Sequence, residues 1–157
     1  MTLRTALLRG QIFRACHLVA VLDALNGYYI IPGQEPSIVQ RAAGANMSVD
    51  VGAFKYVFGG TFGEKTTTTN KAVDASDATN PRIDLLYLAT GGTISILKGT
   101  AGAKVPTSET DWEKYEEPYP ADFSTTTGLL LAEIEVPAGA TAITDDNIRR
   151  ICVPVAF

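Results

Sequence analysis

The chain has 157 residues, of which 46% are hydrophobic and 19% are charged, so it is long enough and apolar enough to bury one hydrophobic core. Its net charge of −4, without a basic cluster, argues against nucleic acid as a partner. One histidine and two cysteines exclude a disulfide scaffold and a histidine-rich metal site built from a single chain. We therefore expect a single domain that holds no metal and no cofactor.

Residues 1–27 have the pattern of a helix. The apolar positions recur at intervals of four and three residues, which places them along one side of a helix: Leu8, Ile12, Ala15, Val19 and Leu22. Gly27 is of the residue type that most often follows a helix end. This apolar seam predicts either a helix packed on its own domain or a helix packed between subunits.

The same segment resembles a targeting peptide, because three arginines precede its first acidic residue, Asp23. Its apolar run, from Ala15 to Leu22, is short for a signal peptide and far short of the ~20 residues that span a membrane. We expect the segment to be retained and the protein to have no membrane partner. Cys16 and Cys152 both lie in apolar stretches, so we expect reduced and buried thiols.

Residues 28–45 predict an extended arm between the helix and the rest of the chain. Tyr28 and Tyr29 begin a short apolar run that Pro32 and Gly33 stop. We expect these two tyrosines to contact another subunit, and we expect a short strand at Ile38.

From Asn46 onward the hydrophobic period changes to two, which is typical of half-buried strands. The alternation predicts strands near residues 47–51 and 54–58, with Gly52 and Ala53 at a turn or bulge between them. The glycine pair at 59–60 ends the second strand. The threonine tract at 65–70 indicates an edge strand.

Residues 82–89 are apolar on both strand faces, which predicts a central strand. The glycine pair at 91–92 predicts a β-hairpin into residues 93–98. Further strands are expected at 129–136 and 151–157, and Thr144 is expected to cap a short helical turn. Arg82 and Asp84 share one strand face, where they can pair with each other or meet Asp145 or Asp146. The predicted fold class is mainly β: an antiparallel β-sandwich or barrel-like domain over 46–157, with one N-terminal helix and an extended arm.

The sequence offers little catalytic chemistry. His17 lies beside Cys16 on the predicted helix, where adjacent side chains point about 100° apart and do not face each other. The glycine pairs do not have the spacing of a phosphate-binding loop. The acidic residues at 109–117 are best explained as a solvated loop or a subunit contact. We therefore expect no catalytic residues and no enzymatic activity.

Aromatic residues in that acidic loop leave an alternative open. Sugar-binding surfaces stack sugar rings on exposed aromatic side chains, and three such residues lie close together in sequence: Trp112, Tyr115 and Tyr119. They predict a contact with a glycan or with a protein partner. A carbohydrate-binding module is therefore a second hypothesis.

Four stretches in this order resemble a module of tailed-virus structural proteins, which occurs in tail-fibre, baseplate and minor virion proteins. They are MSVDVGAF (Met47–Phe54), NPRIDLLYLA (Asn80–Ala89), ISILKGTAGAKVP (Ile94–Pro106) and LLLAEIEVPAGATAITDDNIRR (Leu129–Arg150). The resemblance covers about two thirds of the chain. Residues 1–45 and the acidic loop at 106–120 depart from the family pattern.

The resemblance implies a non-enzymatic virion structural protein, an oligomeric building block of the tail, the baseplate or the fibre attachment region. A capsid-surface decoration or turret protein is the alternative location on the particle. The implied partners are other copies of the chain, as a homotrimer or another cyclic oligomer, other virion proteins and, for the aromatic loop, a host-surface glycan. The residues expected at the oligomer or virion contact are Leu8, Ile12, Val19, Leu22, Tyr28 and Tyr29.

Overall fold

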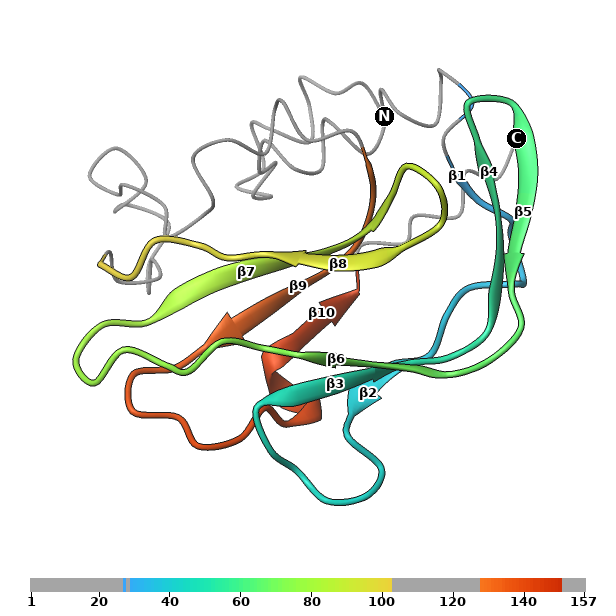
Figure 1. Cartoon of the computed structure of the whole chain (residues 1–157). Coiled ribbons are helices and arrows are strands. Elements are labelled where there is room, and N and C mark those ends of the chain that lie inside the picture. The colour runs from blue at the N-terminus through green and yellow to red at the C-terminus, as the bar shows by residue number, and fades with distance from the viewer. Residues whose placement is uncertain (1–26, 28, 103–127, 151–157) are drawn as a thin grey trace, which may run out of the picture.

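The computed structural model describes residues 27, 29–102 and 128–150, and strands make up about half of them (Figure 1). The strands are β1 Tyr29–Ile30, β2 Ile38–Gln40, β3 Ser48–Val51, β4 Phe54–Phe58, β5 Thr61–Lys65, β6 Thr69–Ala72, β7 Arg82–Ala89, β8 Ile94–Leu97, β9 Gly128–Val136 and β10 Ile148–Arg150. A 3-10 turn, η3 Asp145–Asn147, precedes β10. The prediction of a mainly β protein is confirmed. The helix predicted over residues 1–27 and the strand predicted at 151–157 lie outside the described residues, Gly27 excepted.

The described strands form three antiparallel sheets with the orders β1-β4-β5, β2-β3-β6 and β10-β9-β7-β8. In the four-stranded sheet, β7 lies between β9 and β8. Leu85 and Leu86 point to opposite faces of β7 and are 1% and 0% exposed, which confirms the predicted central strand. The predicted hairpin is the pair β7–β8.

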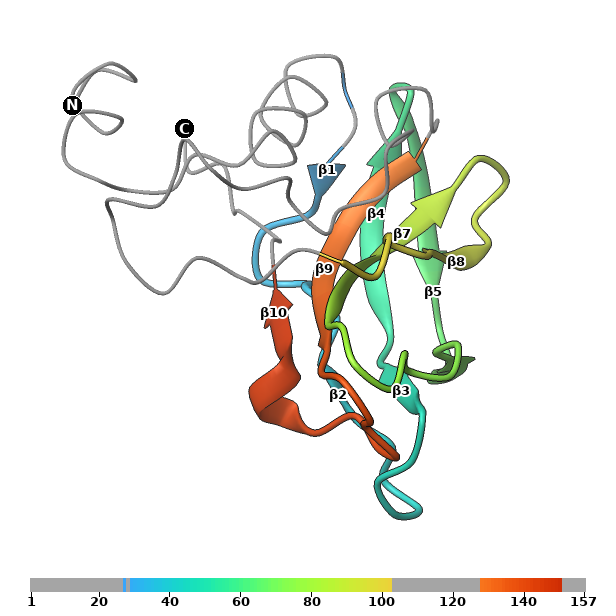
Figure 2. The ribbon, with the colours of Figure 1, turned by 90° about the vertical axis from the view of Figure 1, so that its left-hand side faces the viewer.

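Two of the sheets are joined by a long bent hairpin. β3 continues into β4 and β5 continues into β6, so the same two chain segments pair in both three-stranded sheets (Figures 1 and 2). The bend falls at Gly52, where the backbone N–H donates to the Ser37 carbonyl at 2.7 Å. An added Cβ at Gly52 would collide with the Ser37 hydroxyl, so a larger residue here would force the Ser37 side chain to turn away.

Residues 29–40 of the predicted arm lie in the sheets of their own chain. β1 pairs with β4 and β2 pairs with β3, which confirms the short strand expected at Ile38. Ile30 and Ile38 are 6% and 2% exposed and belong to the hydrophobic core. Burying each of them stabilises the fold by roughly 1.5–3 kcal/mol, which is the reason why this segment does not stand apart from the β domain.

All three sheets contribute to one core. Val49 and Val51 of β3 share it with Leu86 and Leu88 of β7 and with Ile134 of β9. Hydrogen bonds link the β2–β3 region to the segment before β10: the Ile143 N–H donates to the Asn46 carbonyl at 2.9 Å, and the Gln40 N–H donates to Asp145 Oδ1 at 2.6 Å. The core therefore combines residues of all three sheets.

The predicted turns are confirmed. Gly59 and Gly60 form a two-residue hairpin turn with φ of 58° and 77°, a conformation that glycine adopts without strain. The expected helical turn is η3, where Asn147 Oδ1 accepts hydrogen bonds from the Thr144 N–H and hydroxyl, both at 3.0 Å. Local sequence signals of this kind act within four residues, so they are readable without the tertiary structure.

Candidate functional site

Of the residues that the sequence predicted for contacts, the structure describes Tyr29. The other predicted contact residues lie outside the described part of the chain: Leu8, Ile12, Val19, Leu22, Tyr28, Trp112, Tyr115 and Tyr119. Within the described residues, three places have buried charge, a cleft or exposed apolar surface. They are a buried ion pair on β7, a cleft beside β4, and the outer face of the β1-β4-β5 sheet.

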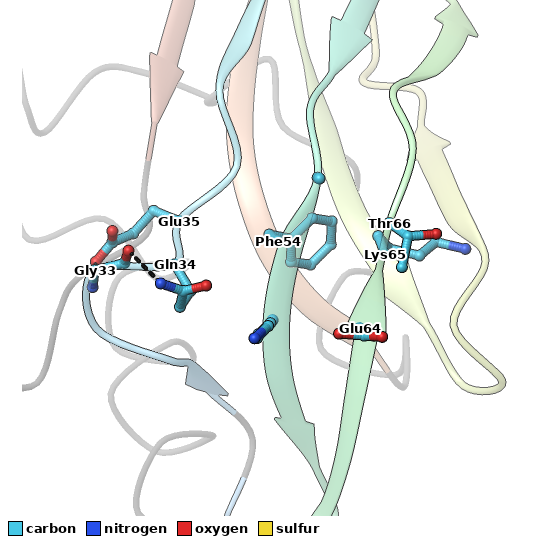
Figure 3. Close-up of a pocket in the computed structure, with 9 residues that line it drawn as sticks. Gly33, Gln34, Glu35, Phe54, Glu64, Lys65 and Thr66 are labelled. Atoms are coloured by element: carbon cyan, nitrogen blue, oxygen red, sulfur yellow. Dashed lines mark hydrogen bonds between the residues drawn. The ribbon is translucent and has the colours of Figure 1, made fainter.

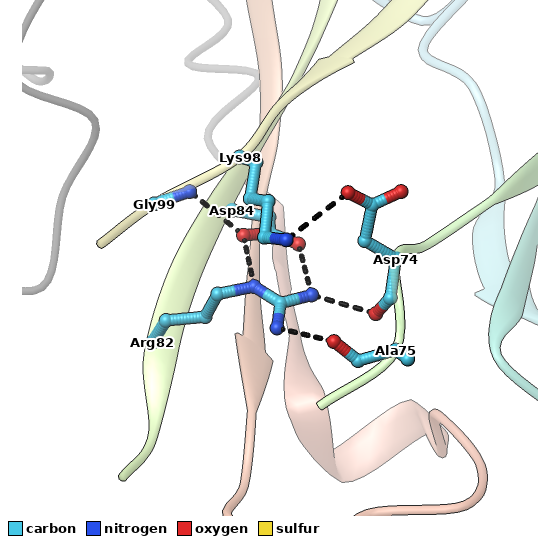
Figure 4. Close-up of polar contacts among 6 residues, drawn as sticks. All are labelled: Asp74, Ala75, Arg82, Asp84, Lys98 and Gly99. Carbon is cyan, nitrogen blue, oxygen red and sulfur yellow. Dashed lines mark hydrogen bonds and ion pairs between the residues drawn. The ribbon is translucent and has the colours of Figure 1, made fainter. Parts of the chain in front are cut away.

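The buried ion pair joins Arg82 and Asp84, which are 1% and 0% exposed (Figure 4). Arg82 Nε donates to Asp84 Oδ1 at 2.8 Å and Nη2 donates to Asp84 Oδ2 at 3.1 Å, so the guanidinium binds both carboxylate oxygens. Nη2 also donates to the Asp74 carbonyl at 2.6 Å, and Nη1 donates to the Ala75 carbonyl at 2.8 Å. Of the two pairings that the sequence left open for these residues, the structure has the one between Arg82 and Asp84.

Further contacts extend this group to the end of β8. The Gly99 N–H donates to Asp84 Oδ1 at 2.8 Å, and Lys98 Nζ lies 3.2 Å from Asp74 Oδ2 at an exposed position (Figure 4). Within the described residues, no buried side-chain nitrogen or oxygen lacks a hydrogen-bond partner. The charged groups of Arg82 and Asp84 thus bind to each other and to the backbone of two further segments. We call this group the clasp, because its contacts hold segments together and leave no reactive group free.

A cleft of about 400 Å³ lies between the 33–35 loop and the strands β4 and β5 (Figure 3). The charged residues in its lining are Glu35, Lys55, Glu64 and Lys65, and Phe54 supplies an aromatic side. Glu35 Oε1 accepts the Gly33 N–H at 2.9 Å, and this hydrogen bond holds the pKa of Glu35 below its ordinary value. The lining holds two carboxylates and two ammonium groups, which gives the cleft no preference for an anion or a cation.

The outer face of the β1-β4-β5 sheet carries a row of apolar side chains. Tyr29 pairs with Val57, and Val57 pairs with Phe62, so the three lie side by side across the three strands and share one face. Tyr29 is 36% exposed and Phe62 is 58% exposed. We call Tyr29, Val57 and Phe62 the outer row.

A charged pair lies beside the outer row. Lys55 pairs with Glu64, two positions along β4 and β5 from Val57 and Phe62, so both lie on the same face as the row. Both are exposed. The outer face therefore presents an apolar pair and an oppositely charged pair on the same two strands.

The inner face of this sheet explains why the outer row is held in place. Ile30, Phe54, Tyr56 and Phe58 alternate with the outer residues and pack on the core. Tyr56 lies over Gly63, where an added Cβ would be 2.5 Å from the ring, and its hydroxyl reaches Gly92 in the β7–β8 turn. The sheet is thereby anchored to the rest of the molecule through its inner face.

The alternation at residues 54–58 predicts a strand, but it does not predict this surface, of which Tyr29 is the one residue expected to make a contact. The signal was present: a two-residue glycine turn at 59–60 fixes the register of the hairpin, and counting outward from it pairs Val57 with Phe62 and Lys55 with Glu64.

No protein-family model, curated protein or solved structure matches this chain. Among the described residues, no group of three or more histidine, cysteine or acidic side chains is placed to hold a metal ion. In the same part of the chain, no helix is long and apolar enough to cross a membrane.

Proposed function

We propose that this chain is a non-enzymatic structural protein of a tailed-virus particle, an oligomeric building block of the tail, baseplate or fibre attachment region. The observation that carries the proposal is the outer row. Its members Tyr29 and Phe62 are exposed, while the inner face of the same sheet packs on the hydrophobic core. Exposed apolar surface on a rigid element is typical of protein contacts. The charged groups of the clasp serve the fold, and the outer face offers contact surface rather than reactive groups.

The proposed body of this building block is a β-sandwich. In this arrangement β10-β9-β7-β8 and β2-β3-β6 are the two layers, and the core residues of both sheets meet between them. The third sheet then projects from one end as a continuation of the β3–β6 pair. A projecting sheet with one exposed face is well placed to meet a neighbouring protein.

The order of the four stretches that resemble tailed-virus structural proteins supports the same role. Three of them cover the central strands of the described fold: β3 in Met47–Phe54, β7 in Asn80–Ala89 and, except for Gly128, β9 in Leu129–Arg150. In the proposed particle, the apolar seam of residues 8–22 packs between subunits, as a homotrimer or another cyclic oligomer, or against other virion proteins.

Immunogold electron microscopy of purified particles, combined with mass spectrometry of their proteins, tests this function. Label at the tail end supports a tail or baseplate component, and label over the head supports a decoration or turret protein. Particles that neither bind the antibody nor contain peptides of this chain would overturn the virion assignment.

A carbohydrate-binding module is the second candidate, because Trp112, Tyr115 and Tyr119 lie within one short stretch of sequence. Glycan-panel binding by the purified chain, lost in Trp112→Ala, would favour it. The same panel without any binding would exclude it.

A further inference from the structure

We propose that the outer face of the β1-β4-β5 sheet is a contact between two copies of this chain, related by a two-fold axis that runs along the seam between β4 and β5. The inference rests on the proposed function, because it assigns a partner to one surface of the same assembling protein. Its test needs only the purified chain, so the contact and the virion assignment can fail separately.

The residue pairs on this face make it complementary to itself. Val57 and Phe62 are partners across β4 and β5, and two positions along the strands Lys55 and Glu64 are partners in the same way. A two-fold axis parallel to the strands exchanges β4 and β5 between the copies. It therefore sets Val57 of one copy over Phe62 of the other, and Lys55 of one copy over Glu64 of the other.

Other symmetric arrangements of the same face are less favourable. An axis that runs across the strands, over the outer row, would carry the Lys55–Glu64 pair of one copy to the opposite side of the row, away from its complement. For Lys55 and Glu64, an axis along the seam gives two unlike charge pairs and no like pair. Two aligned sheets pack about 10 Å apart, a distance that the Phe62 ring and the long Lys55 and Glu64 side chains can bridge.

The two parts of the face have different roles in this contact. Phe62 is 58% exposed, and burying it against a second copy removes apolar surface from water. Surface ion pairs add little affinity, but mismatched charges oppose the wrong register, so Lys55 and Glu64 select the orientation. The face is small, so we expect weak association of the purified chain and a larger effect where many copies are held together.

The charge pattern favours a second copy over a partner of one charge sign. An acidic surface would be repelled by Glu64 and a basic surface by Lys55. A second copy places a lysine opposite Glu64 and a glutamate opposite Lys55. Both residues are exposed, and they follow the apolar pair on the same strands.

Charge-reversal variants test the contact by sedimentation velocity over a range of concentrations, with the full chain kept reduced. The wild type is expected to show a concentration-dependent association step. Lys55→Glu and Glu64→Lys are each expected to weaken this step at least tenfold. An equimolar mixture of the two variants, and the double variant, are expected to restore it, because each again sets unlike charges opposite one another.

Controls separate this step from other events. Asp146→Lys changes the charge at an exposed position on η3, away from this sheet, and should associate as the wild type does. Far-UV circular dichroism of each variant verifies the fold.

Phe62→Ser is expected to weaken the association step without changing any charge. If this variant does not fold, the charge variants carry the test. A wild type without the step, single variants that associate as the wild type does, or a folded mixture that fails to associate would each overturn the proposal.

Discussion

Arg82 and Asp84 show what a buried charge does in this molecule. Moving two ionised groups out of water is costly, and their mutual attraction offsets the cost only where the geometry is good and the remaining groups are bonded. Here the guanidinium binds both carboxylate oxygens and two carbonyls, and the carboxylate also accepts the Gly99 N–H. At the residue scale the pair therefore determines which segments meet at the start of β7.

Removing one partner of this pair should be far more harmful than replacing both. We expect Asp84→Ala to lower the free energy of unfolding by about 3–5 kcal/mol, because it leaves a buried guanidinium without its counter-charge. The double variant Arg82→Met/Asp84→Leu should lose less. Urea unfolding of the three proteins measures the difference, and a single variant as stable as the double variant would contradict this account.

Asp50 should make stability depend on pH. Its carboxylate accepts the Ala42 N–H at 2.9 Å and the Asn70 side-chain amide at 2.8 Å, and these bonds hold its pKa below the ordinary value. A lowered folded-state pKa means that the stabilisation is present above the unfolded pKa, about 3.9, and is lost as pH falls through the folded value.

We therefore expect Asp50→Asn to have a lower Tm than the wild type at pH 6 and a flatter dependence of Tm on pH below about 4. Thermal unfolding followed by circular dichroism between these pH values measures both effects. Asp146→Asn, at an exposed position, is the control. Parallel profiles of Asp50→Asn and the wild type would show that the hydrogen bonds of Asp50 do not contribute.

At the scale of elements, the β4–β5 hairpin depends on Tyr56. Its ring covers Gly63 on the paired strand, and its hydroxyl reaches Gly92 in the turn between β7 and β8. An aromatic side chain lying over a cross-strand glycine fills the space that the glycine leaves. The ring thus links two hairpins that belong to different sheets.

Gly63→Ala should disturb this link. The added Cβ would lie 2.5 Å from Tyr56 Cζ, and Gly92 also lies against the Tyr56 hydroxyl, which limits how far the ring can move. We expect a loss of about 1–3 kcal/mol of unfolding free energy, typical of overpacking. Gly102→Ala is the matched control, since a Cβ there meets nothing within 4 Å. Equal stability of the two variants in urea would refute the role given to Tyr56.

At the scale of the whole molecule, the fold depends on contacts between residues far apart in sequence. β7 pairs with β9 across the chain segment that contains β8 and residues 98–127. β2 approaches η3 through the hydrogen bond from the Gln40 N–H to Asp145. Such pairings must close long loops before they stabilise the fold.

Slow refolding is expected from this topology. Antiparallel β domains with non-local pairing fold in milliseconds to seconds, whereas helical bundles fold faster. Stopped-flow dilution from urea, followed by far-UV circular dichroism under reducing conditions, should resolve the main phase. Complete refolding within the dead time of mixing would contradict the expectation.

The sequence by itself determined several strands, two hairpin turns and the shared strand face of Arg82 and Asp84. Alternation identified β3 and β4, and apolar residues on both faces identified β7. Glycine pairs identified two hairpin turns, and Arg82 and Asp84 were placed on one face because residues i and i+2 of a strand always share a face. These signals depend on residues close together in the chain. The register of the β4–β5 hairpin was also readable in this way, and the outer row could have been predicted in part from it.

Only the tertiary structure decided which strands became neighbours. Nothing local in residues 29–40 requires them to pair with β3 and β4, and nothing local sets Tyr29 beside Val57. The bend at Gly52 depends on the approach of Ser37 from another segment. Pairing between distant strands depends on the packing of the whole core, so the outer row, on which the proposed contact rests, forms only once the chain is folded.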